Sequence, residues 1–306
     1  MATSEAALGQ ARDVRVNGAT IRYHDTGAGA PIVFVHGVLV NSDLWRKVVP
    51  LLADRHRCIA PDLPLGAHQL PTTGRADLSP PGLAKLIDQF LARLDLEDVT
   101  LVANDTGGAL AQVLVTQRPE RVGRLVLTPC DAFRNCPPTL TKAFQPLGYV
   151  PGAYWATAHT AFRVRPLVRL LFGQLAKTPL SDELYESYVR PGLSNRGVVR
   201  DFARVFRQLR PKHTRAAAER LPGFGKPALV VWAADDRFFP VDHGRRLAEL
   251  LGARFEVVDD SRTFVSEDQP EQLAALLDDF LKSHGSWGRG VGRPLPERSW
   301  PGAAGQ

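Results

Sequence analysis

The chain has 306 residues, a formal net charge of +6 at neutral pH and 44% hydrophobic residues. This length suits one large α/β domain, or a domain with an insertion, and the apolar content suffices for a sizeable core. No apolar run approaches the ~20 residues of a membrane span, and residues 1–10 lack the regions of a signal peptide. The three cysteines leave an odd thiol and no disulfide framework. The sequence therefore predicts a cytoplasmic protein with no membrane partner. No nucleic-acid-binding motif is present, so no nucleic-acid partner is expected.

The positive charge is unevenly distributed along the chain. Residues 134–225 hold 15 Lys and Arg against 5 Asp and Glu, an excess of 10, which leaves about −4 for the rest. The asymmetry fits an anionic or carrier-bound substrate, and it fits equally an arginine-rich solvated surface.

Short apolar runs alternate with helical patterns along most of the chain. Residues 1–12 are expected to form a loose lead-in, and Asn17-Gly18 indicates a hairpin turn. Pro31–Val35 is continuously apolar, as in a strand buried on both faces. The alternation favours a parallel, doubly wound sheet. Further strands are expected at 57–60, 99–102, 122–127, 228–232 and 255–258, and helices after Ser79 and at 108–117, 241–251 and 269–281.

Residues 134–222 break this alternation with helical stretches that prolines interrupt. We interpret them as a helical cap inserted between two parts of an α/β core, residues 1–133 and 223–284. Residues 285–306 are rich in Gly, Pro and Arg without an apolar period, so they are expected to form a mobile tail.

The run from Val99 to Leu110 is typical of a nucleophile elbow, a strand, sharp turn and helix with small residues around the reactive side chain. Ala103 and Gly107 fill the small positions and Asp105 stands at the apex. A carboxylate there can attack an electrophilic carbon and form an ester. The alternative is that Asp105 only caps the helix.

Two further segments also follow strands, where open α/β sheets build their sites. His36-Gly37-Val38 places a backbone N–H that, with the N–H of Thr106, could hold an oxygen atom. His36 itself is expected to fix this turn. Asp235 and Asp236 follow a third strand and offer an acid.

Together, the His-Gly turn, the N-D-T-G-G elbow and the W-x-x-x-D-x-x-x-P segment resemble the haloalkane dehalogenase and epoxide hydrolase branch of the α/β-hydrolase superfamily. The resemblance covers about residues 13–284. It implies an eight-stranded, mostly parallel sheet with helices on both faces, no cofactor or metal ion, Asp105 as nucleophile and Asp236 as orienting acid. It also implies a pocket under the cap, with substrate contacts expected from His36, Val38, Thr106, Trp155 and Phe238.

The sequence departs from that branch at the catalytic histidine, whose place after the last strand is taken by Thr263. Thr106 and Val38 also stand where dehalogenases carry a halide-holding Trp and Asn, and epoxide hydrolases usually have a proline after the His-Gly turn. Without the histidine, hydrolysis of an Asp105 ester needs another base. His68 and His159 are candidates, and an epoxide would need a proton from one of the tyrosines Tyr149, Tyr154, Tyr185 and Tyr188.

The sequence therefore predicts a cofactor-free α/β-hydrolase-family enzyme that uses Asp105, Asp236 and Thr263 on a hydrophobic small molecule. An epoxide, ester or alkyl electrophile would be hydrolysed. Two alternatives stay open. Asp105 could act as general acid or base in an isomerase, lyase or cyclase, or the chain could be a ligand-binding pseudoenzyme.

Overall fold

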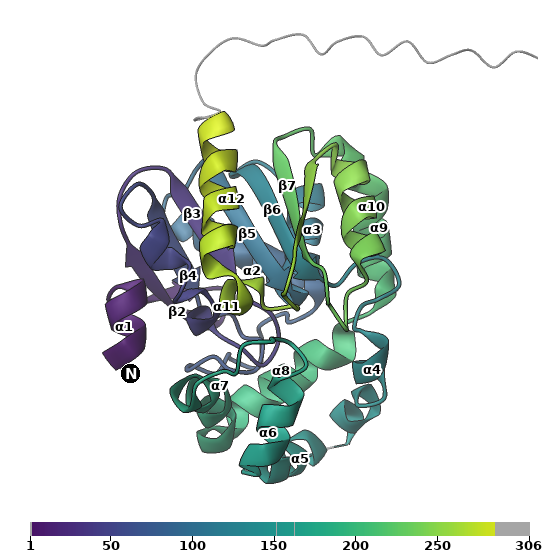
Figure 1. The fold of residues 1–306 in the computed structure, drawn as a ribbon. Coiled ribbons are helices and arrows are strands. Elements are labelled where there is room, and N and C mark those ends of the chain that lie inside the picture. The colour runs from purple at the N-terminus through teal and green to yellow at the C-terminus, as the bar shows by residue number, and fades with distance from the viewer. Residues whose placement is uncertain (1, 151, 162, 285–306) are drawn as a thin grey trace, which may run out of the picture.

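The computed structural model describes residues 2–150, 152–161 and 163–284. An eight-stranded sheet in the order β1-β2-β4-β3-β5-β6-β7-β8 forms its centre (Figure 1). The pairs β1/β2 and β2/β4 are antiparallel, and the other neighbours are parallel, as predicted. The strands are Ala11–Val16 (β1), Ala19–Thr26 (β2), Pro31–Val35 (β3), Arg57–Pro61 (β4), Val99–Asp105 (β5), Val122–Cys130 (β6), Ala228–Ala233 (β7) and Arg254–Val258 (β8).

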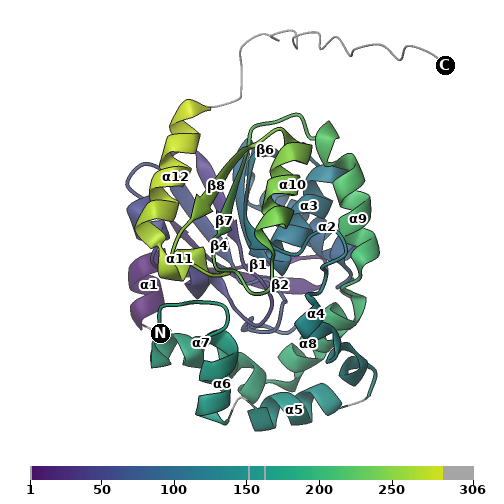
Figure 2. The ribbon, with the colours of Figure 1, turned by 45° about the vertical axis from the view of Figure 1, so that its right-hand side comes forward.

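Helices cover both faces of this sheet, as Figure 2 shows. Successive residues of a strand point to opposite faces. In β3, Val33 and Val35 join the core under α2, α3, α9 and α10, while Ile32 and Phe34 join the core under α1 and α12. This double burial explains why the central strands are continuously apolar. The helices outside the β6–β7 connection are Ala2–Leu8 (α1), Pro80–Arg93 (α2), Thr106–Gln117 (α3), Val241–Leu251 (α10), Val265–Asp268 (α11) and Pro270–Ser283 (α12).

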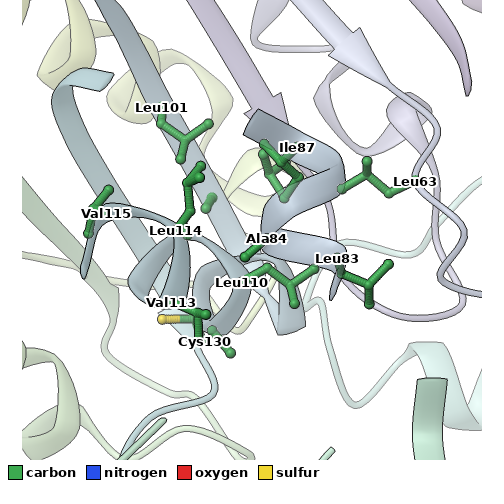
Figure 3. Close-up of a cluster of buried hydrophobic side chains, with 14 of the residues drawn as sticks. Leu63, Leu83, Ala84, Ile87, Leu101, Leu110, Val113, Leu114, Val115 and Cys130 are labelled. Carbon is green, nitrogen blue, oxygen red and sulfur yellow. The ribbon is translucent and has the colours of Figure 1, made fainter. Parts of the chain in front are cut away.

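The helix that follows the elbow, α3, is held by close packing against α2. Figure 3 shows Leu110 and Leu114 of α3 beside Leu83 and Ile87 of α2, all within one buried cluster. The Ser79 side chain accepts a hydrogen bond from the N–H of Gly82 and so caps α2 at its start. The packing fixes the start of α3, and therefore the position of Asp105.

Among the described residues, six α-helices lie between β6 and β7, and we call them the inserted helices. Figures 1 and 2 draw α4 to α8 beyond the end of the sheet at which β6 ends, whereas α9 runs alongside the sheet next to α10. They are Thr139–Lys142 (α4), Ala153–Ala161 (α5), Arg165–Phe172 (α6), Asp182–Ser194 (α7), Arg196–Gln208 (α8) and Pro211–Arg220 (α9).

A buried carboxylate on α8 ties the inserted helices to the core. Asp201 is fully buried and accepts hydrogen bonds from the backbone N–H of Thr72 at 2.6 Å and from the Arg200 guanidinium at 3.1 Å. The Nε2 of His68 lies 3.5 Å from its Oδ2. Burial acts to raise the pKa of Asp201, but its bonds to His68 and Thr72 outweigh burial and leave the pKa lowered. We call these four residues the Asp201 clasp.

The expectation of a loose lead-in over residues 1–12 was wrong. Residues 2–8 form α1, and β1 begins at Ala11. Leu8 is 1% exposed and packs into the core beside Val48 and Val49. A single buried leucine in so short a segment produces no readable helical period, because tertiary packing stabilises α1. The expected tail, residues 285–306, lies outside the described residues.

None of the helices in the described ranges is both long and apolar enough to cross a bilayer.

Candidate active site

The backbone of Asp105 adopts the strained turn that an elbow requires. Its φ is 53° and its ψ is −132°, between the end of β5 and the start of α3 at Thr106. The helix begins two residues before the expected Gly108. Although Asp105 stands at the position before the first helical residue, its side chain forms no capping hydrogen bond. The structure therefore contradicts the alternative that Asp105 only caps the helix.

Two glycines allow the turn after β3 to approach the elbow that carries Asp105. A Cβ on Gly107 would overlap the carbonyl oxygens of His36 and Val35, and a Cβ on Gly37 would overlap the Asp105 carboxyl. Both positions therefore require glycine by close approach, and neither requires it through a positive φ.

Gly37→Ala is expected to slow any reaction of Asp105 on the order of a hundredfold, because the new methyl group must displace the carboxyl. We expect the unfolding free energy to fall by about 1–3 kcal/mol as well, since the site is already close-packed. The rate of covalent labelling of Asp105, followed by intact mass spectrometry, measures the first effect. Gly223→Ala is the matched control, because a Cβ there meets no atom within 4 Å. Unchanged labelling of Gly37→Ala would contradict this geometry.

The carboxyl of Asp105 is 8% exposed, and its Oδ2 accepts a hydrogen bond of 3.2 Å from the N–H of Val38. The pKa of Asp105 is raised to about 7, mainly by burial and in smaller part by the nearby carboxyl of Asp236, although the N–H groups of Val38 and Thr106 act to lower it. The two predicted N–H groups thus both act on Asp105. Near neutral pH the carboxyl is divided between its acid and its carboxylate.

His36 supports the turn that carries Val38. It is fully buried, its Nδ1 donates to the carbonyl of Gly37 at 2.8 Å, and its Nε2 accepts from the N–H of Leu63 at 2.9 Å. Burial lowers the pKa of His36 to about 4, so the ring is neutral. With both nitrogens engaged, His36 has none left for a substrate; it orients the backbone.

Asp236 is the buried acid of its segment, and Asp235 is not. The Asp235 side chain is 50% exposed and pairs with Lys177. Asp236 Oδ1 accepts hydrogen bonds of 2.7 Å from the N–H groups of Phe238 and Phe239. Phe238, which was expected to contact a substrate, therefore holds Asp236 through its backbone. Burial raises the pKa of Asp236 more than these bonds lower it, and the pKa is about 6 as a result.

Two buried polar atoms of Asp236 and Thr263 are unsatisfied within the described part of the chain. Asp236 Oδ2 and Thr263 Oγ1 are buried, and neither forms a hydrogen bond of good geometry with any residue of the described ranges. The Thr263 hydroxyl is nevertheless close enough to Asp236 to lower the pKa of its carboxyl. Buried polar groups normally find partners, so these two atoms are an exception within the site.

Sequence reasoning missed two polar residues beside the elbow. The Asn104 amide donates to the carbonyl oxygens of Thr263 at 2.8 Å and Pro129 at 3.1 Å, and so joins three strand ends. Asp131 is fully buried after β6 and accepts 2.8 Å from the Thr106 hydroxyl. Burial raises the pKa of Asp131 well above its ordinary value, with a smaller contribution from Asp105. Its position after a buried strand is the signal that could have revealed it.

The remaining candidates have partners away from the elbow. Trp155 stacks on His159 with ring centres 4.7 Å apart, and Arg196 lies 4.1 Å from its ring centre. His68 belongs to the Asp201 clasp, and its Nδ1 accepts from the N–H of Gly66 at 3.4 Å. Both nitrogens of His68 are therefore occupied, which removes it as a substitute base.

The contacts of the four candidate tyrosines do not identify a single proton donor. The Tyr154 hydroxyl donates to the carbonyl of Phe144 at 2.7 Å, and the Tyr149 hydroxyl accepts from Arg210 at 2.6 Å. Tyr188 is buried with no hydroxyl partner among the described residues, and burial raises its pKa well above the ordinary value. Tyr185 packs edge-on against Phe172.

A mostly parallel eight-stranded sheet, a strained strand–turn–helix apex and a polar residue after a later strand define the α/β-hydrolase fold. The chain belongs to the alpha/beta hydrolase fold family, which matches residues 30–270.

Three similar proteins illustrate the range of chemistry in this family. Haloalkane dehalogenase 2 of Mycobacterium tuberculosis is 27% identical over 270 residues, which are 84% of this chain and 90% of that protein. A cis-3-alkyl-4-alkyloxetan-2-one decarboxylase of Shewanella oneidensis is 31% identical over 286 residues, 87% of this chain and 86% of that protein. An alpha/beta hydrolase fold protein from Burkholderia ambifaria superposes with a TM-score of 0.75 at 26% identity, covering 88% of this chain and 97% of that one. These relationships support an enzyme of the α/β-hydrolase family.

Proposed function

We propose that this chain is an enzyme in which Asp105 attacks a small hydrophobic molecule at carbon and forms an ester. The observation that carries the proposal is the Asp105 carboxyl at the strained elbow, within hydrogen-bond distance of the Val38 N–H. On this proposal the inserted helices cap the site, and the N–H groups of Val38 and Thr106 stabilise charge on the reacting oxygen atoms.

The first candidate reaction is hydrolysis of an alkyl, epoxide or ester electrophile, which the relationship to a haloalkane dehalogenase supports. Water must then attack the Asp105 ester, and a general base speeds such a step by about 10²–10⁴. Thr263 supplies a neutral hydroxyl where that base would stand. Hydrolysis through this site would therefore be limited by the loss of the ester.

The second candidate is the decarboxylation of a β-lactone, which needs no water. It is favoured by Thr263 and by the 31% identical oxetanone decarboxylase. The Asp105 carboxylate attacks ring carbon C4, a C4–O ester bond forms, and the ring C4–O bond breaks to leave a free carboxylate. The bond from C3 to that carboxylate then breaks, its electron pair forms the C3–C4 double bond, and the C4–O bond to Asp105 breaks. The products are an alkene, CO₂ and the restored Asp105 carboxylate, with no proton gained or lost.

The two reactions are distinguished by their products from a cis-3,4-dialkyl oxetan-2-one in ¹⁸O-labelled water. Decarboxylation yields alkene and CO₂. Hydrolysis yields a hydroxy acid, which gains ¹⁸O from the second turnover onward because water first labels the Asp105 carboxyl. Asp105→Asn should abolish either product. Tight binding without an Asp105-dependent product or adduct would contradict the proposal and favour a ligand-binding protein.

A further inference from the structure

Exposed apolar side chains gather on the inserted helices. Of the nine large hydrophobic residues that are clearly exposed in the described ranges, seven lie between residues 144 and 171. Soluble monomers rarely concentrate exposed apolar residues in this way, and such clusters mark interaction sites. The seven are Phe144, Tyr149, Val150, Val164, Leu167, Leu170 and Leu171.

Four of them lie on or directly before one short helix, α6. Val164 is 46% exposed, Leu167 37%, Leu170 62% and Leu171 49%, and we call these four residues the α6 face. At 100° per residue they occupy one continuous arc of the helix. Val168 and Phe172 lie at the edge of this arc and turn into the core, so one apolar side of the helix runs from buried to exposed positions.

The α6 face stands where a partner can reach it. Figures 1 and 2 draw α5 and α6 at the end of the inserted helices that lies farthest from the sheet. No part of the described chain covers Leu170, and its exposure would leave most of an apolar side chain in water.

The surroundings of the α6 face are basic. Arg163, Arg165 and Arg169 line a cleft between α6 and α7 together with Asp182 and Glu186. Arg169 pairs with Asp182, whereas Arg163 and Arg165 form no ion pair within the described ranges. Residues 134–210, which belong to the same end of the molecule, hold 12 Lys and Arg against 4 Asp and Glu, an excess of eight. An anionic partner is therefore attracted to this end and not to the rest of the chain.

We infer that the α6 face docks on the surface of an anionic phospholipid bilayer. With eight residues, α6 is about 12 Å long and cannot span a bilayer. Leucines that enter the headgroup boundary, combined with arginines that attract anionic lipids, are the elements of an interfacial helix. This inference replaces the expectation, drawn from the sequence, of no membrane partner. It does not depend on the reaction of Asp105.

Co-sedimentation with phospholipid vesicles tests the docking. The full chain is expected to bind vesicles of phosphatidylcholine mixed with phosphatidylglycerol, and to bind pure phosphatidylcholine vesicles much more weakly. Leu170→Asp should weaken binding to the mixed vesicles on the order of tenfold or more, since one leucine is lost from the apolar contact. Leu51→Asp is the matched control, because Leu51 is 42% exposed on a distant segment, and it should bind as the wild type does. Thermal melts establish that both variants are folded.

A second pair of changes tests the charge. Arg163→Gln with Arg165→Gln should weaken binding to the mixed vesicles by roughly fivefold per arginine, and added salt should weaken it too. Absence of wild-type binding, or equal effects of Leu170→Asp and Leu51→Asp, would overturn the inference. A wild-type dimer in light scattering that Leu170→Asp dissociates would overturn it in favour of a second copy of the chain on the α6 face.

Discussion

Asp105→Asn is expected to abolish a covalent adduct that a small alkyl halide leaves on the wild-type protein. On our proposal the Asp105 carboxylate displaces the halide and becomes an alkyl ester. This ester holds no carboxylate to lose as CO₂, and Thr263 offers no base to activate water, so the adduct should persist. Intact mass spectrometry detects it as the mass of the alkyl group, and peptide analysis assigns it to residue 105. Asparagine is a far weaker nucleophile in a side chain of the same shape.

Thr263→His in the wild-type background should then let the adduct turn over, faster on the order of 10²–10⁴. The new ring would stand beside Asp236, whose Oδ2 has no hydrogen-bond partner among the described residues. Thr263→Ser is the matched control, since it keeps a hydroxyl and supplies no base. Fast turnover by the wild type without an adduct would show that another group already serves as base, and His159 would be tested next.

Asp105→Asn should also stabilise the folded protein at pH 8. Burial raises the folded-state pKa of Asp105 to about 7, above the ordinary 3.8. Between these values the unfolded chain releases this proton while the folded chain retains it. The free energy of unfolding therefore falls as the pH rises from about 4 to about 7. At about 1.4 kcal/mol per pKa unit the loss is at most about 4 kcal/mol, and asparagine does not incur it.

Thermal melts from pH 4 to pH 8 measure this effect. At pH 8 the melting temperature of Asp105→Asn should exceed that of the wild type on the order of 5 °C, and the two should converge toward pH 4. Asp242→Asn removes a carboxylate that is 92% exposed and serves as the control. Parallel curves for Asp105→Asn and the wild type would contradict a raised pKa at residue 105.

Patterns confined to one element could be read from the sequence. The unbroken apolar run of β3 predicts a strand that is buried on both faces. In the structure β3 is buried in the middle of the sheet, between β4 and β5. The spacing of Ala103, Asp105 and Gly107 predicts the elbow, because close approach of two backbones allows only small residues there.

Features that depend on distant segments could not be read in the same way. The sequence left Asp235 and Asp236 open until the family resemblance selected Asp236. Their difference in burial depends on how the β7 loop meets Thr263, more than twenty residues farther on. Asn104 shows the same limit, because its amide donates to the carbonyl oxygens of Pro129 in β6 and of Thr263 after β8. Nothing in the residues around it indicates that role.

The Asp201 clasp restricts how a ligand can enter. Lifting the inserted helices away as a rigid lid would separate Asp201 from the N–H of Thr72 and from His68. The bonds of the clasp therefore oppose such a movement. Entry by a smaller rearrangement, in which α5 and α6 shift while α8 keeps its place, preserves those bonds. On our proposal, α8 then stays in place while a ligand reaches Asp105 past α5 and α6.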